Sequence, residues 1–181
     1  MIAVDRNNSE AAEILIANKA RTDVRNKDGR MALHIAAAAL RRKAVELLLN
    51  AKPEVTASSA GVDVRGVEVD AKDSSGRTPL MLAADNEQFV PDDVMKLLLD
   101  KGAQLNAQDP EGNTPLILAA KAGSMSGVEF LVGSGAEVNA KNNAGETALF
   151  YARKIHLHDR IYNAKLVEDR VVEMLLKAGA K

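Results

Sequence analysis

The chain has 181 residues, 46% of them hydrophobic and only 3% aromatic, with a formal net charge of −1. This is long and apolar enough for one domain with a real core, and the near-neutral charge argues against binding nucleic acid or an anionic membrane by bulk attraction. The absence of cysteine excludes disulfides, structural thiolate metal sites and thiol catalysis, but leaves the redox compartment open. No window approaches the roughly 18 apolar residues of a membrane span, and residues 1–20 lack the charged-then-apolar layout of a signal peptide. We therefore expect a soluble monomer; the compartment is not encoded, with the cytoplasm slightly favoured.

A short motif recurs along the chain. Gly-Arg-Thr-Pro-Leu stands at 76–80 and Gly-Asn-Thr-Pro-Leu at 112–116, with looser copies at 29–33 and 145–149. The motif glycines are 76 − 29 = 47, 112 − 76 = 36 and 145 − 112 = 33 residues apart. A period near 33 with a Thr-Pro-Leu signature is the mark of ankyrin repeats. The chain therefore resembles the ankyrin-repeat family along nearly its whole length.

The residues of each unit have a physical logic of their own, shown here for residues 72–107. Gly76 suits a turn that requires positive φ, Thr78 can cap a helix through its hydroxyl, and Pro79 fits the first helical position. Leucine and alanine then predict a short first helix, and the apolar spacing predicts a second helix over 93–101. The following unit repeats this plan without insertion.

The resemblance implies an all-α fold, a solenoid of about five helix-turn-helix units with projecting β-turn or hairpin loops, in a single domain over 1–181. The expected units are 1–25 (partial), 26–71 (with a hairpin insertion), 72–107, 108–140 and 141–181 (with an extended outer helix). The first unit lacks its opening turn. This favours a fragment or processed form of a longer chain over a natural short protein with divergent caps, because end repeats usually need polar outer faces.

Three places depart from the period. The unit 26–71 is 47 − 33 = 14 residues too long, and alternation over 62–69 predicts a hairpin that is either a partner contact or a tolerated surface loop. An excess of 36 − 33 = 3 residues around 87–92 predicts a longer loop between helices. The last unit has 11 extra residues between Arg153 and Arg170, from (171 − 152) − (44 − 36), which predicts an outer helix extended back by about three turns.

The histidines do not indicate an active site. His34 occupies the family's Thr-Pro-Leu-His position, where the resemblance implies a structural hydrogen bond to nearby backbone, and no serine or carboxylate is placed to work with it. His156 and His158, with Asp159, are favoured as surface residues over a metal site, because helix positions two apart point away from each other. We expect no enzyme activity, and no catalytic, cofactor-binding or metal-binding residues.

The resemblance implies a non-catalytic module, a scaffold or regulator that presents a concave surface to a partner protein. The alternative is a substrate-positioning ankyrin segment of a larger enzyme or secreted effector. In the family, binding usually uses the turn tips and the exposed side of the first helices. The matching positions in this chain are Lys27, Arg30, Ser75, Arg77, Asp85, Asn86, Glu111, Asn113, Lys121, Ala122, Ala144, Glu146, Tyr151 and Arg153. An exposed Tyr151 would outweigh the charged rim as an anchor, and the partner's identity is not written in these residues.

Overall fold

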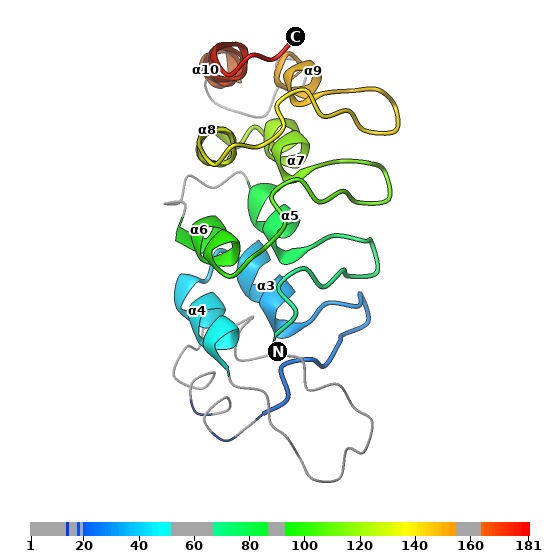
Figure 1. The fold of residues 1–181 in the computed structure, drawn as a ribbon, viewed down its shortest axis with the longest axis vertical. Helices are drawn as coiled ribbons and strands as arrows, with labels where there is room; N and C mark the ends of the chain where they lie inside the picture. Colours follow the sequence, from blue (N-terminus) through cyan, green and yellow to red (C-terminus); the bar gives the residue numbers. More distant parts are fainter. Residues whose placement is uncertain (1–13, 15–17, 19, 52–66, 87–92, 155–163) are drawn as a thin grey trace.

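The structure, a computed structural model, describes residues 14, 18, 20–51, 67–86, 93–154 and 164–181, with the backbone alone for 164–168. These residues contain helices, turns and no strand. The helices, labelled as in Figure 1, are α3 (Ala32–Ala38), α4 (Arg42–Asn50), α5 (Pro79–Ala84), α6 (Asp93–Asp100), α7 (Pro115–Ala122), α8 (Met125–Gly133), α9 (Ala148–Ala152) and α10 (Ala164–Lys177).

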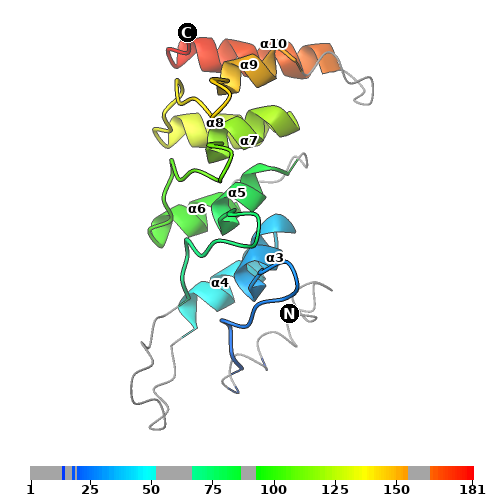
Figure 2. The same ribbon diagram turned by 90° about the vertical axis from the view of Figure 1, so that its right-hand side faces the viewer.

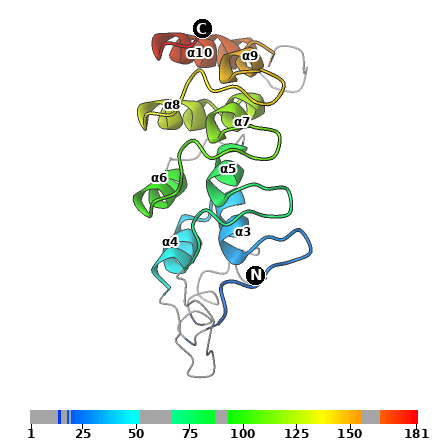
Figure 3. The ribbon, with the colours of Figure 1, turned by 45° about the vertical axis from the view of Figure 1, so that its right-hand side comes forward.

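The helices form two layers, joined by loops that project to one side. The inner helices α3, α5, α7 and α9 follow one another along the molecule, and each pairs with the outer helix that comes next in the sequence. Figure 3 shows the loops extending from the inner layer, away from the outer helices. Figure 2 shows the pairs following one another in chain order toward the C-terminus. The expected all-helical fold of paired helices is confirmed.

Three inner helices begin in the way that the Thr-Pro-Leu motif predicts. The hydroxyls of Thr78, Thr114 and Thr147 each accept a hydrogen bond at 3.3 Å from the backbone N–H three residues further on. Pro79 and Pro115 stand in the first turn, where a missing N–H breaks no helical bond. The short motif therefore fixes where these helices start.

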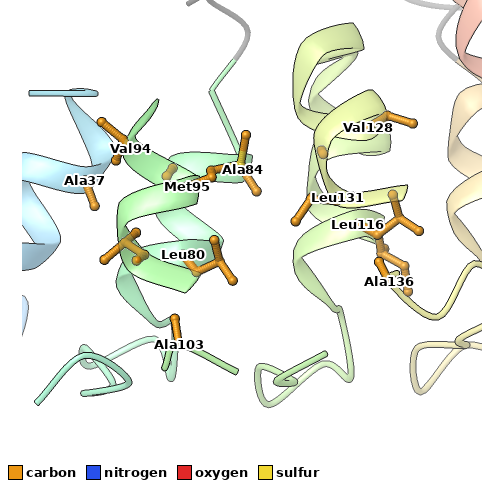
Figure 4. Close-up of a cluster of buried hydrophobic side chains, with 14 of the residues drawn as sticks. Ala37, Leu80, Ala84, Val94, Met95, Ala103, Leu116, Val128, Leu131 and Ala136 are labelled. Atoms are coloured by element: carbon orange, nitrogen blue, oxygen red, sulfur yellow. The ribbon is translucent and has the colours of Figure 1, made fainter. Parts of the chain in front are cut away.

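The core lies between the layers and between successive pairs. It is made of leucine, valine and alanine, and Figure 4 shows Leu80 and Val94 on one pair and Leu116, Val128 and Leu131 on the next. The inner helices carry fully buried alanines, which allow neighbouring helices to approach closely. Each pair buries its apolar side chains against the next, as expected for a repeat that could not form a core alone.

The turn between paired helices differs between units. α7 ends at Gly123, which has φ 71° in the left-handed region. Leu40 holds the corresponding place after α3 with φ 51°. This conformation costs a residue with a side chain about 1–2 kcal/mol, so the unit 26–71 contains a strained turn that glycine relieves in the unit 108–140.

The predicted insertions are described only in part. α10 has 14 residues against 9 in α8, so the described outer helix is 14 − 9 = 5 residues longer, which is about 1.4 turns. The remainder of the predicted three-turn extension would fall in residues 155–163, which lie outside the described residues. The predicted loop at 87–92 and most of the predicted hairpin lie outside them too, as does most of the partial first unit.

Candidate protein-binding surface

Each loop is organised by one Asn or Asp, three residues before the loop glycine. At Asn26, Asp73 and Asn142, the side-chain oxygen accepts from the backbone N–H groups two and four residues further on, at 2.9–3.0 Å. Asp109 accepts from the N–H four residues on, at 2.8 Å. Such bonds hold a turn in one shape. The sequence-based candidates do not include these positions, although an Asn or Asp before each glycine is a visible signal.

Adjacent loops are hydrogen-bonded to each other. The N–H of Ser74 donates to the carbonyl of Asp28, and the N–H of Asn143 donates to the carbonyl of Glu111, both at 2.9 Å. Pro110 stands at the corresponding place in the loop between them and has no N–H to donate. Its ring lies so close to Gly76 that a Cβ there would be 2.5 Å from the proline Cδ. Along the four loops, each therefore contacts the next, through a backbone hydrogen bond at the first and third contacts and through close packing of Pro110 on Gly76 at the second.

A side-chain ion pair joins the first two loops. The guanidinium Nε of Arg30 donates to Asp73 Oδ2 at 3.0 Å, and the Asp73 side chain is only 1% exposed. Burial alone would raise the pKa of Asp73, but hydrogen bonds from Arg77 N–H, the Arg30 side chain and Ser75 N–H outweigh burial and hold the pKa below its usual value. Arg30 is therefore committed to holding the loops together.

His34 joins the first inner helix to the next loop. Its Nδ1 accepts from the N–H of Met31 at 3.2 Å, so the neutral ring carries its proton on Nε2, which donates to the carbonyl of Ala71 at 2.8 Å. Burial lowers the pKa of the fully buried His34 ring. The expected backbone hydrogen bond is confirmed. Where side chains are described, no three His, Asp or Glu residues gather as metal ligands, and His156 and His158 lie outside the described residues.

Tyr151 lies in the corner between the last described loop and the inner helices. Its hydroxyl donates to Glu146 Oε2 at 2.6 Å and accepts from Asn142 Nδ2 at 3.2 Å. The bond between them raises the pKa of Tyr151 and lowers that of Glu146, because it stabilises the neutral phenol and the ionised carboxylate together. The half-buried ring has Lys121 Nζ 5.5 Å from its centroid.

A family model of ankyrin repeats, in three copies, matches residues 1–109, 62–142 and 89–181. The chain belongs to the ankyrin-repeat family. Ankyrin repeats are in general protein–protein interaction modules. In the comparison with curated proteins, nothing matches this sequence. In the parts of the chain that are described, no helix has the length and apolar character needed to span a bilayer.

The candidate positions of this ankyrin chain differ in exposure. The exposed ones are Lys27, Ser75, Glu111, Lys121, Ala144 and Arg153. The half-buried ones are Arg30, Arg77, Asp85, Asn86, Ala122, Glu146 and Tyr151. Asn113 is buried, at 5% exposure. Its amide donates to Asp109 at 3.0 Å and its oxygen accepts from Asn142 at 3.1 Å, so it serves the joint between loops and offers little to a partner.

Several candidates near α5 are engaged within the chain. Arg77 Nη1 forms an ion pair with Asp85 Oδ2 at 2.7 Å, and both side chains are partly exposed. Asn86 Nδ2 donates to the carbonyl of Ala38 at the end of α3, at 2.9 Å. The structure thus brings these residues together along one side of the inner helices, where they tie one unit to another or pair with each other.

Proposed function

We propose that this ankyrin chain is a non-catalytic protein-binding module that acts as a scaffold or regulator. The partner docks on the inner surface, which we define as the loops at 26–30, 73–77, 109–113 and 142–146 together with the exposed sides of α3, α5, α7 and α9. The observation that carries the proposal is the hydrogen bonding and packing that hold these loops in place. Each is braced by its own Asn or Asp, and each contacts the next, while its tip remains exposed.

Rigidity matters because a partner that meets an ordered surface loses less conformational freedom on binding. The exposed tips carry Lys27, Ser75 and Glu111, and the inner helices add Lys121 and Arg153. Varied polar side chains on a fixed frame are what selective recognition requires. His34, the described histidine, has both ring nitrogens engaged by backbone, which supports a structural role over acid–base chemistry.

The test is affinity capture with two charge-swapped variants. Glu111→Lys/Lys121→Glu alters the inner surface, and Lys96→Glu/Glu129→Lys alters exposed positions on the outer helices α6 and α8 with the same net charge. We expect the wild-type chain and the outer variant to capture similar amounts of the same proteins. The inner variant should capture at least about tenfold less, which corresponds to a loss of about 1.4 kcal/mol in binding free energy. Equal recovery on both variants, with folding verified by circular dichroism, would show that the inner surface is not the binding site.

A further inference from the structure

We propose that the C-terminal end of the inner surface binds an acidic segment of the partner. The site, which we call the cationic corner, consists of Lys121 in the last turn of α7, Arg153 and Lys154 just after α9, and Tyr151, whose ring centroid lies 5.5 Å from Lys121 Nζ. This inference rests on the proposed function, since it specifies the chemistry of the partner that meets the same surface.

One motif position, at or just after the end of each inner helix, changes charge along the chain. It lies nine residues after each loop glycine: 38 − 29, 85 − 76, 121 − 112 and 154 − 145 all equal 9. The residues there are Ala38, Asp85, Lys121 and Lys154. Since the repeat places this position at the same end of each inner helix, the surface runs from neutral through acidic to basic toward the C-terminus.

The acidic member of this row is neutralised, whereas the basic members are not. Asp85 is paired with Arg77 at 2.7 Å. Lys121, Arg153 and Lys154 are all exposed, and no carboxylate in the described part of the chain forms an ion pair with any of them. Among the described residues, these three cations therefore face solvent without an ion-pair partner.

Glu146, a carboxylate whose pKa responds to the charges of Lys154 and Lys121, is held by other donors. Glu146 Oε2 accepts from Tyr151 at 2.6 Å and from Asn142 Nδ2 at 3.3 Å. The Tyr151 hydrogen bond is the main cause of the lowered pKa of Glu146, and the charges of Lys154 and Lys121 lower it further, although neither lysine forms an ion pair with this carboxylate. Tyr151 and Asn142 thus engage the Glu146 carboxylate, which forms no ion pair with Lys121 or Lys154.

The corner also offers an apolar contact with fixed geometry. The Tyr151 ring packs edge-on against Phe150, with 5.5 Å between centroids, and its hydroxyl is anchored on both sides. A tyrosine held in one rotamer loses little entropy on binding and is a frequent hot spot. The arrangement therefore fits a segment with several carboxylates beside one apolar side chain, which the cations attract and the ring orients.

The test uses a displayed library of random 16-residue peptides, selected on the folded wild-type chain. We expect the selected peptides to be enriched in Asp and Glu. Their dissociation constants, measured by fluorescence anisotropy, should weaken at least about tenfold with Lys121→Glu/Lys154→Glu. The control Lys96→Glu/Lys101→Glu makes the same change of net charge on the outer side and should shift the constants less than about twofold.

A second variant tests the role assigned to Glu146. Glu146→Gln removes a negative charge that acts on the same corner as Lys121 and Lys154, so the selected acidic peptides should bind about two- to fivefold tighter. Enrichment without Asp and Glu, or affinities unmoved by the corner variants, would overturn the acidic partner while leaving the binding module intact. Failure to select any peptide counts against both proposals. A labelled single-stranded oligonucleotide that binds as tightly as the peptides would replace the acidic protein segment with nucleic acid.

Discussion

The joint between the units 108–140 and 141–181 can be compared with the far side of the unit 141–181, against which no other described helix packs. Five residues after the loop glycine, Ile117 is 1% exposed at the joint, whereas Phe150 is 37% exposed on the far side. A Cβ on Gly112 would lie 2.6 Å from Asn143 of the next loop, whereas a Cβ on Gly145 would meet nothing within 4 Å. Residues at equivalent motif positions therefore differ in burial and in their contacts with a neighbouring unit.

The outer helices show the same contrast. Val132 and Leu176 both stand three residues before the glycine that follows their helix, at 135 − 132 and 179 − 176. Val132 is half-buried, and Leu176 is 48% exposed. A residue's contribution to stability in this chain therefore depends on the neighbouring unit more than on its place in the motif, as expected for an array held by nearest-neighbour contacts.

The largest expected effect is the difference in unfolding free energy between alanine substitutions at Ile117 and at Phe150. Ile117→Ala leaves a cavity in the joint and should lower the free energy of unfolding by about 2–5 kcal/mol. Phe150→Ala removes a partly solvated ring and should cost less than about 1.5 kcal/mol. Urea denaturation followed by circular dichroism measures both. Equal losses would mean that the far side is as well packed as the joint.

A smaller difference in stability is expected between alanine substitutions at the loop glycines Gly112 and Gly145. Both have positive φ, 79° at Gly112 and 78° at Gly145, so an alanine is strained at either place by about 1–2 kcal/mol. Gly112→Ala also pushes its Cβ into the backbone of Asn143, 2.9 Å from the nitrogen, which should add about 1–3 kcal/mol. The comparison of denaturation midpoints isolates the loop contact. If Gly145→Ala is the more damaging change, the loop joint does not have the role assigned to it.

The smallest effect is a pH dependence at the first joint, where His34 stands at the position that Phe150 occupies in the last unit. The pKa of His34 is lower in the folded state, so the unfolded chain binds the proton more readily. Stability contributed by neutral His34 is present above the unfolded pKa of about 6.5 and is lost as the pH falls through the folded pKa. Denaturation midpoints between pH 7.5 and 5 should decline in the wild type and decline less in His34→Gln. The same slope in both proteins would assign the pH dependence to other groups.

Local features could be predicted from the sequence because the interactions that produce them span only a few residues. Thr78 and Thr114 cap helices that begin at the following proline, and the second helix expected over 93–101 is α6, Asp93–Asp100. The candidate surface was harder to predict. The motif placed Asn113 and Arg77 among exposed candidates, but one is buried between loops and the other is paired with Asp85.

The sequence by itself determined the period, the family, the starts of the inner helices and the loop glycines, because caps, prolines and positive φ act within one turn of chain. Tertiary structure alone decided which side chains each neighbouring unit covers or engages. Ile117 and Phe150 share a motif position, yet one is buried and the other exposed. Lys121 and Asp85 share another, yet in the described part of the chain only Asp85 forms an ion pair. Burial arises from contacts between successive units, and the Arg77–Asp85 pair forms because the fold brings together two side chains eight residues apart, so neither is set by the motif.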